Sequence, residues 1–371
     1  MMLEKYPWLE PTYKFLVDSF HAQKAHHAYL LVYHGQIGQD TLMELFARFL
    51  LCQENEHLDY PCNKCRACQA YNLQSNSDFY NLTADKKSHN ISIDNVRTVI
   101  ERVELEPAIS AKNVVLIDDA SKFNINSANA ILKTLEEPPS KTHFIIGLSA
   151  GFNVLPTIRS RCMVVNVNAP TEQQIHDFLT QADITEPDRS YLMALAPEQP
   201  ELMLSMQKKG YIPIFQQTIQ ALANLLDNLE LADFVEVFNT NDLEVFTWQI
   251  EAISNILTLA GRRFFTGEDN TLELLEVLAF DQGADSKPLS QVLTFFKDIL
   301  TDKEIAEDLY DLVEKIMVVN SQLIHFPQQL APENSLKGIA YKVGALIALY
   351  IYNLNREQSM QAFMDFTIGQ N

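Results

Sequence analysis

The segment from Tyr33 to Thr41 has the setting of a phosphate-binding loop, because it lies between an apolar run and a helical pattern and contains two glycines. In a working loop, glycines let backbone N–H groups converge on the phosphates, a lysine meets the β/γ charge, and a Ser or Thr holds Mg²⁺. Here Gln39 and Asp40 follow Gly38 in the positions of the Lys and the Ser/Thr. The Asp40 carboxylate would repel a triphosphate, so we expect a degenerate loop that binds no ATP.

A pair of acids, Asp118 and Asp119, follows the apolar run 113–117. Nucleotide hydrolases place acids there to hold Mg²⁺ and to orient the attacking water. The second acid is usually Glu in such enzymes, and the shorter side chain of Asp119 would not reach the water. Solvated acids at a strand end and a catalytic pair are about equally common explanations, and beside Gln39 we favour the solvated acids. We therefore interpret the pair as a degenerate Walker B motif without a catalytic role.

Four of the five cysteines, Cys52, Cys62, Cys65 and Cys68, form a C-x9-C-x2-C-x2-C array. Four thiolates complete a closed tetrahedral zinc site, which is structural because no coordination position stays open for water. An iron–sulfur cluster normally has a fourth cysteine three residues after such a run, followed by proline, and residues 69–71 supply neither. We predict structural zinc over iron–sulfur or buried thiols, with His57 as the replacement ligand should Cys52 be internal.

Arg161 lies in the tripeptide Ser160-Arg161-Cys162, in a polar turn between Leu155-Pro156 and an apolar run. An arginine there can extend from the domain surface, and its guanidinium can stabilise the charge on a neighbouring protein's γ-phosphate. One such tripeptide is a weak signal, since most surface arginines face solvent or form local ion pairs. It gains weight beside a loop that has lost its own nucleotide chemistry.

The elements that must position these residues alternate between short apolar runs and helical patterns in the first half of the chain. The predicted strands are 28–32, 113–117, 144–148 and 163–167, and the predicted helices include 41–51, 93–103 and 124–135. Buried strands alternating with helices indicate a parallel sheet covered by helices. The fold class is therefore α/β in this half.

The pattern becomes all-α after residue 168, where Thr171 and Gln174 have the spacing of a capping box. A small helical unit ends near Gly210, and apolar stripes at helical spacing continue from there. One predicted core stripe consists of Phe215, Ile219, Leu222, Leu226 and Leu229. We predict three domains, at residues 1–168, 169–209 and 210–371.

Length and charge limit the classes of protein that fit. The chain has 371 residues, 47% of them hydrophobic, and a net charge of -20. Residues 1–168 carry 16 Lys and Arg against 18 Asp and Glu, whereas residues 169–371 carry 12 against 30. So acidic a C-terminal half would repel DNA and anionic membranes, which favours a protein partner.

The N-terminal residues lack a basic segment followed by an apolar run, and the longest apolar stretch, residues 344–352, is too short to cross a bilayer. We expect no membrane partner and a cytoplasmic protein, in which cysteines bind metal or stay as thiols.

The run Ser127-Ala-Asn-Ala-Ile-Leu-Lys-Thr-Leu-Glu-Glu-Pro-Pro139, with Leu155-Pro156 and Ser160-Arg161-Cys162 after it, resembles the clamp-loader branch of the AAA+ proteins. The opening Tyr6-Pro-Trp-Leu9, the segment Ala25-His-His-Ala28 and the loop without lysine narrow the resemblance to bacterial DNA polymerase III clamp loaders. The motifs are specific across residues 1–170. The helical remainder matches mainly in order and length.

This resemblance implies an AAA+ domain with a P-loop-like parallel sheet and a zinc insertion at about 52–68, a small helical lid domain and a C-terminal helical collar domain for oligomerisation. It implies a stator without ATPase activity of its own. The expected partners are the gamma/tau ATPase subunits and the delta subunit, and, through the complex, the sliding clamp and primed-template DNA. The four cysteines match the family's zinc ligands, and Arg161 matches the finger that reaches the adjacent gamma/tau ATP.

Two departures from the family pattern bear on these expectations. The spacing from Cys52 to Cys62 is slightly long. Residues 194–205 contain no arginine where active relatives use a sensor to touch ATP, which agrees with Gln39 in denying nucleotide turnover.

Two other classes of protein were weighed against this interpretation. An active clamp-loader ATPase motor needs a cation in place of the loop lysine, and the loop contains none. A zinc-ribbon protein that binds nucleic acid is weakly permitted by Lys64 and Arg66, but aromatic stacking platforms are absent there and the acidic remainder opposes it.

Overall fold

The computed structural model describes residues 3–85, 90–229, 231–240, 242–266, 292, 295, 303–325 and 335–368. The chain forms two compact units, each made of two separate segments of the chain. The N-terminal unit comprises Met1–Ile184 and Glu198–Leu202, and the C-terminal unit comprises Thr185–Pro197 and Met203–Asn371. Residues 169–209, predicted as a lid domain, are shared between these units, and the division into three domains remains a prediction.

A five-stranded parallel sheet forms the centre of the N-terminal unit, with the strand order β2-β3-β4-β1-β5. Its strands are β1 (Ala28–Tyr33), β2 (Phe79–Leu82), β3 (Asn113–Ile117), β4 (Thr142–Ser149) and β5 (Met163–Asn166). Because the strands are parallel, the segments that follow β1 and β3 leave the sheet at the same side, where the carboxyl ends of the strands lie. The loop after β1 and the pair Asp118-Asp119 after β3 are therefore on this side of the sheet.

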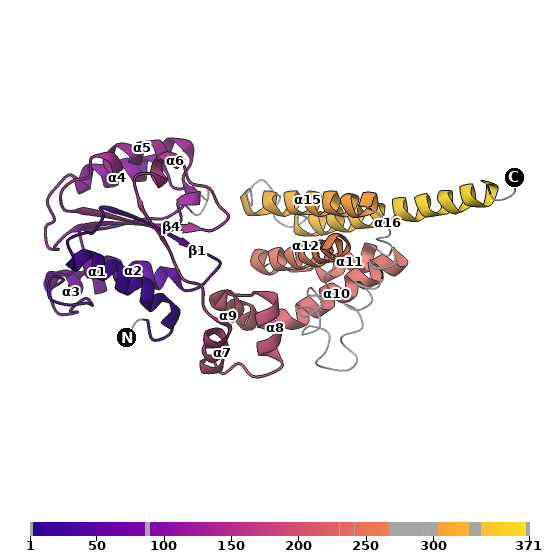
Figure 1. Cartoon of the computed structure of the whole chain (residues 1–371), viewed down its shortest axis with the longest axis horizontal. Helices are drawn as coiled ribbons and strands as arrows, with labels where there is room; N and C mark the ends of the chain where they lie inside the picture. The colour runs from indigo at the N-terminus through magenta and orange to yellow at the C-terminus, as the bar shows by residue number, and fades with distance from the viewer. Residues whose placement is uncertain are drawn as a thin grey trace. The chain divides into compact units, whose positions relative to one another are not determined.

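Helices cover both faces of this sheet (Figure 1). On one side lie α1 (Glu10–His21), α2 (Gln39–Leu51) and α3 (Arg66–Asn72), and on the other lie α4 (Ile93–Val103), α5 (Ile125–Glu136) and α6 (Pro156–Arg159). All five residues of β3 are buried, as expected for a strand covered on both faces. The short helices η1 (Pro7–Leu9) and η2 (Ala120–Lys122) and the helix α7 (Glu172–Gln181) complete the unit.

Local sequence signals account for several element boundaries. Ser92 begins α4 by accepting a hydrogen bond from the Asn95 N–H at 3.1 Å, and a reciprocal capping box of Thr171 and Gln174 begins α7. All four predicted strands are present, with ends within two residues of the prediction. The strand β2 was missed because it has only four residues and lies at the edge of the sheet, so its pattern was not continuously apolar.

The C-terminal unit is helical throughout its described residues. Its helices are α8 (Asp188–Leu195), α10 (Tyr211–Asn228), α11 (Leu231–Val237), α12 (Leu243–Thr266), α15 (Lys303–His325) and α16 (Ser335–Ile368), and α9 (Pro200–Lys208) begins in the N-terminal unit's last segment and continues into this one. Within the unit, α12 packs along α15, and α16 contacts α10, α11 and α15. Aromatic side chains such as Phe234, Phe238 and Phe246 fill the core.

The predicted apolar stripe of α10 is confirmed at four of its five positions. Phe215, Ile219, Leu222 and Leu226 are buried, but Leu229 is 40% exposed. Leu229 follows the end of α10 in a left-handed conformation with φ 56°, so its side chain leaves the helical stripe. Among the described helices, none combines the length and the apolar character needed to cross a bilayer.

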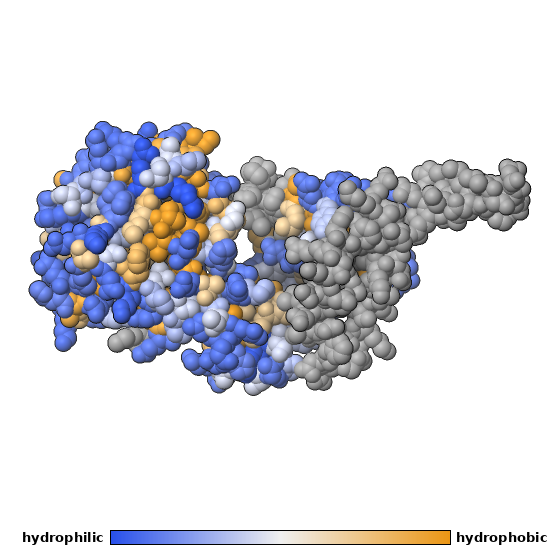
Figure 2. Space-filling model, viewed as in Figure 1, coloured by the Kyte–Doolittle hydropathy of each residue, from blue (hydrophilic) through white to orange (hydrophobic). Residues whose placement is uncertain are grey.

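Hydrophilic residues predominate on the face of the N-terminal unit shown in Figure 2, with hydrophobic areas among them, the largest near its centre. Large apolar side chains exposed on this unit include Phe152 and Val164, and Val164 lies three residues after Arg161.

Candidate functional sites

The loop predicted to be a degenerate phosphate-binding loop joins the end of β1 to the start of α2 and contains two left-handed glycines. Gly35 has φ 63°, and Gly38, the residue before α2, has φ 82°. Such conformations favour glycine because it lacks a Cβ. The Gln39 Oε1 accepts a hydrogen bond from the Ile37 N–H at 3.1 Å. The side chain in the position of the phosphate-binding lysine thus folds back onto its own loop.

Side chains from two distant segments of the same unit cover this loop. A Cβ on Gly35 would lie 2.3 Å from the Gln199 side chain, and one on Gly38 would lie 2.6 Å from the Tyr6 ring. The Glu201 N–H donates to the Gln36 carbonyl at 3.1 Å. Both glycines are therefore in contact with the protein's own side chains.

A polar cluster fixes this cover in place. The Glu201 carboxylate accepts hydrogen bonds from the Tyr6 hydroxyl and, at 2.8 Å, from the Lys5 Nζ. The Tyr6 ring packs against Trp8 and Phe178, and the Trp8 indole N–H donates to the Ile37 carbonyl at 2.9 Å. Sequence reasoning missed Gln199 and Glu201, because they lie about 160 residues after the loop and no local pattern marks them.

Four acids lie around the loop, and the charges of three of them raise the pKa of the fourth, Asp118. Burial, together with the charges of Asp40, Glu44 and Asp119, raises the pKa of Asp118 to about 6. Desolvation and the charge of Glu201 raise the pKa of Asp40, although its side chain keeps contact with solvent. The Asp119 carboxylate accepts a hydrogen bond from the Ser121 N–H at 2.9 Å and so caps η2. This carboxylate has a local structural partner.

The four predicted metal ligands converge in the structure. Cys52 follows the end of α2, Cys65 is the N-cap residue of α3, and Cys68 lies within α3. The sulfur atoms of these three residues and Cys62 all lie within 4.8 Å of one another, with Cys62 Sγ and Cys68 Sγ 4.0 Å apart. Tetrahedral Zn–S bonds of about 2.3 Å place sulfur atoms about 3.8 Å apart, so the four residues fit one zinc-sized ion.

Backbone N–H groups point at these sulfur atoms, as expected around metal-bound thiolates. Cys52 Sγ accepts from the N–H groups of Glu54 and Cys62 at 3.4 Å, and Cys62 Sγ accepts from those of Lys64 and Cys65 at 3.4 and 3.2 Å. Burial opposes ionisation of Cys62, but these donors outweigh it and lower the pKa of its thiol.

The cysteine cluster is closed and attached to the sheet unit. Arg48 of α2 donates to Asn63 Oδ1 at 2.7 Å and to Asn72 Oδ1 at 3.2 Å, and thereby joins the cluster's turn to α3. In the described part of the chain, it is the one place where three or more potential metal ligands from Cys, His, Asp and Glu converge. His57 is not a member of it, so the four cysteines could hold a metal ion without the replacement ligand.

Arg161 lies in the turn between α6 and β5, where its side chain is folded against the protein. Its Nη1 donates to the Thr157 carbonyl at 2.8 Å, and its Nη2 forms an ion pair with the Glu136 carboxylate. The side chain is 30% exposed. Sequence reasoning expected an arginine that extends from the surface and missed Glu136 as its partner. The neighbouring Cys162 is separate from the metal cluster, and burial raises the pKa of its thiol to about 12.

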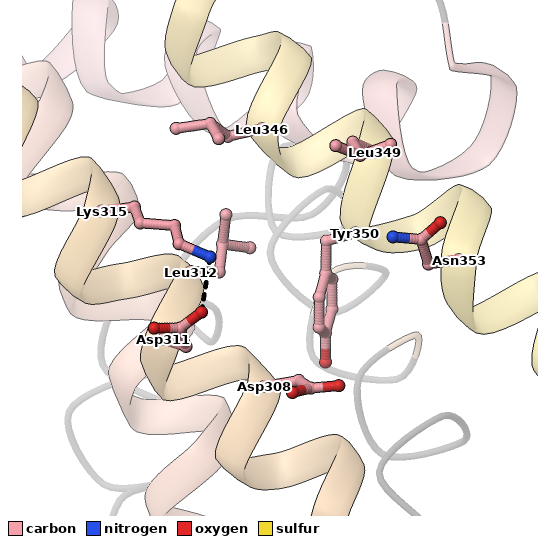
Figure 3. A pocket seen from close by; sticks show the side chains of 8 residues that line it. All are labelled: Asp308, Asp311, Leu312, Lys315, Leu346, Leu349, Tyr350 and Asn353. Carbon is pink, nitrogen blue, oxygen red and sulfur yellow. Dashed lines mark hydrogen bonds and ion pairs between the residues drawn. The ribbon is translucent and has the colours of Figure 1, made fainter.

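The C-terminal unit contains a cavity of about 210 Å³ between α15 and α16 (Figure 3). Asp311 and Lys315 form an ion pair at its wall, while burial and the nearby Asp308 raise the pKa of Tyr350 above its usual value. Two carboxylates against one ammonium group do not favour a phosphate ligand. This cavity therefore does not resemble a nucleotide site.

Comparison with known proteins places these features in a family. A family model described as "DNA polymerase III, delta subunit" matches residues 8–171. The DNA polymerase III subunit delta' of Escherichia coli (strain K12) is 35% identical over 190 residues, which are 51% of this chain and 56% of that protein. The subunit delta' of Pseudomonas aeruginosa is 30% identical over 251 residues, 67% of this chain and 75% of that protein.

The similarity also extends to another subunit of the same polymerase. The DNA polymerase III subunit tau of Bacillus subtilis (strain 168) is 27% identical over 315 residues, 82% of this chain and 51% of that protein. The match spans only about half of the length of the E. coli and B. subtilis relatives. The P. aeruginosa protein is matched over three quarters of its length, and the resemblance found in the sequence is thereby confirmed. The chain belongs to the delta' family of DNA polymerase III subunits.

Proposed function

We propose that this chain is the non-hydrolysing stator of a DNA polymerase III clamp loader. In this role it assembles in the cytoplasm with gamma/tau ATPase subunits and a delta subunit, and supports ATP-dependent loading of the sliding clamp onto primed-template DNA. The observation that carries the proposal is the covered loop, in which Gln39 bonds to the loop itself and Gln199 and Tyr6 lie against its two glycines. The loop keeps the backbone shape of a nucleotide site, while its own side chains take the place of ligand contacts.

Electrostatics support the absence of ATP hydrolysis. A triphosphate at this loop would meet Asp40, Asp118 and Glu201, and no lysine lies in the loop. Lys5 is the candidate to replace that lysine, but its ammonium group is engaged by Glu201 and by the Tyr6 hydroxyl, both at 2.8 Å. Charge repulsion and the loss of this ion pair both oppose nucleotide binding.

Nucleotide binding by the isolated chain separates the stator from the alternative of an active motor subunit, with which the similarity to tau is compatible. We expect no saturable binding of a fluorescent ATP analogue in the presence of Mg²⁺, and no phosphate release. Turnover by the purified chain, abolished by substitution of Lys5, would establish the motor and overturn the stator.

We further propose that Arg161 acts in trans as an arginine finger on the ATP of an adjacent gamma/tau subunit. An arginine finger contributes roughly 10³- to 10⁵-fold to phosphoryl transfer, so Arg161→Ala should silence one nucleotide site of the reconstituted complex. The DNA-stimulated ATPase rate of the complex should fall by the fraction of the total rate that this one nucleotide site contributes. The complex should still assemble. Arg159→Ala is the matched control, because Arg159 is an exposed arginine two residues before Arg161, at the end of α6. An unchanged rate in Arg161→Ala would remove the finger.

The cysteine cluster is proposed to hold a structural Zn²⁺ ion. Four thiolates fill its coordination shell, so the ion would supply stability to the segment from Cys52 to Cys68 and no catalysis. The chain's own contribution is the set of backbone N–H donors that stabilise thiolates at Cys52 and Cys62.

A further inference from the structure

We propose that Glu136 is a positioning residue for Arg161. Its carboxylate holds the Arg161 guanidinium in place before the nucleotide of a neighbouring subunit binds. This inference rests on the proposed role of Arg161 in trans. It concerns a residue of α5 that is 25 positions away in the chain and pairs with the Arg161 guanidinium.

The guanidinium is clamped at both of its terminal nitrogens. Nη2 pairs with the Glu136 carboxylate, while Nη1 donates to the Thr157 carbonyl at 2.8 Å and lies 3.4 Å from the Ser160 hydroxyl. A guanidinium has five N–H donors in a fixed planar fork. These contacts leave the Nε–H and the second Nη2–H for another acceptor, and the side chain is 30% exposed. The clamp therefore fixes the orientation without using all donors.

The location of Glu136 explains why it holds a cation. It is the last residue of α5, and Glu137 follows it directly. The C-terminal end of a helix carries a partial negative charge, so acids there are unfavourable unless a cation offsets them. Arg161 is the cation that pairs with Glu136. The pair thus connects the end of α5 to the turn that carries Arg161.

Clamping matters because a free arginine side chain samples many rotamers. An arginine that is already ordered loses less freedom when it meets a phosphate. Without Glu136, Nη2 loses its anchor and the guanidinium is held by Nη1 alone. We expect the rate at the site served by Arg161 to fall by roughly tenfold, the order of the rotamer entropy of one arginine.

The experiment measures steady-state ATPase activity of the reconstituted clamp loader, with clamp and primed DNA, over a range of ATP concentrations. Glu136→Ala should lower the maximal rate and leave the half-saturating ATP concentration and the assembly of the complex unchanged. Glu136→Gln, which keeps an oxygen acceptor without the charge, should retain an intermediate rate. Glu137→Ala is the matched control, because it removes the same charge from the same helix end but not the partner of Arg161.

A double substitution separates positioning from a general structural effect. Arg161→Ala/Glu136→Ala should be no slower than Arg161→Ala alone, because Glu136 acts only through the guanidinium. If Arg161→Ala lowers the rate and Glu136→Ala is as fast as or faster than the unchanged protein, Glu136 does not position Arg161 and this inference fails while the finger stands. Equal losses in Glu136→Ala and Glu137→Ala would also overturn it. If Arg161→Ala has no effect, the finger itself fails.

Discussion

Two groups of four anion-forming side chains lie in the N-terminal unit, and their surroundings differ. The cysteine cluster gathers its sulfur atoms within 4.8 Å of one another, and backbone N–H groups point at them. The acid group around the loop consists of Asp40, Glu44, Asp118 and Asp119, and the charges that shift Asp118 are all negative. One group is arranged to share a cation, whereas the other repels any anion brought to it.

The difference teaches that backbone shape and ligand chemistry are separable. The loop keeps the left-handed glycines of a phosphate site, yet its contacts come from Gln39, Gln199 and Tyr6. The cysteine cluster keeps both its turns and its ligands. The loop without a lysine is thus covered by the protein's own side chains, while the four cysteines form a site that could hold a metal ion.

Disruption of the cysteine cluster is expected to have the largest effect. Cys65→Ser should prevent binding of the proposed Zn²⁺ ion and unfold the segment from Cys52 to Asn72, because structural zinc contributes roughly 10–16 kcal/mol of apparent binding free energy in zinc-finger peptides. Metal analysis and a thermal melt would measure both losses.

Cys162→Ser is the matched control for that substitution. Cys162 lies outside the cluster, so this variant should keep one zinc per chain. One zinc per chain in Cys65→Ser as well would show that the four sulfur atoms are not the ligands.

Replacement of the loop's second glycine, Gly38, by alanine should destabilise the chain by a smaller amount. This substitution tests whether the loop is covered as tightly as the structure indicates. A Cβ on Gly38 would lie 2.6 Å from the Tyr6 ring, which Trp8 and Phe178 hold in place. Gly151 has a similar φ of 91° against 82°, but a Cβ there meets nothing within 4 Å. Both Gly→Ala changes carry left-handed strain, and overpacking adds about 1–3 kcal/mol to Gly38→Ala alone.

Urea denaturation of the two variants would measure this difference in free energy of unfolding. Adding Tyr6→Ala to Gly38→Ala should give a less than additive loss, because the two changes share one contact. Equal destabilisation by Gly38→Ala and Gly151→Ala would mean that Tyr6 yields at no cost and the loop is only loosely covered.

Sequence patterns predicted the framework well where the cause is local. The strand 113–117 and the helix 93–103 have the predicted ends, since a continuous apolar run and a Ser cap specify them. The convergence of the four cysteines also followed from spacing, because short turns bring C-x2-C thiols together. These features depend on residues that are near one another in the chain.

The contacts that define the loop and the arginine could not be predicted in this way. Glu201 reaches the loop from the first turn of α9, and Glu136 reaches Arg161 from the end of α5. Glu136 lies in the run Ser127–Pro139 that carries the family resemblance, but nothing in the sequence around either acid indicates its partner. Only the fold brings these partners together, so the cover of the loop and the clamp on Arg161 required coordinates.

The smallest expected effect is the loss of free energy of unfolding caused by ionised Asp118 in the acid group, and this loss depends on pH. The pKa of Asp118 is about 6 in the folded chain, above the value of about 3.9 for an unfolded Asp, so the folded state holds this proton more tightly. Above pH 6 the ionised carboxylate therefore lowers the free energy of unfolding, and this cost disappears as the pH falls from 6 towards 4. Because solvent screens this partly exposed carboxylate, Asp118→Asn should stabilise the chain by only about 1 kcal/mol at pH 8 and by little at pH 4.

Chemical denaturation of the unchanged protein and of Asp118→Asn at several pH values would measure this trend. In the Asp40→Asn variant, the pH at which half of this stability change has occurred should be lower, because Asp40 is one of the charges that raise the pKa of Asp118. A gain that is the same at pH 4 and pH 8 would show that packing, and not charge, makes the substitution favourable. The acid group would then differ from the cysteine cluster only in lacking a cation, and not in carrying an electrostatic cost.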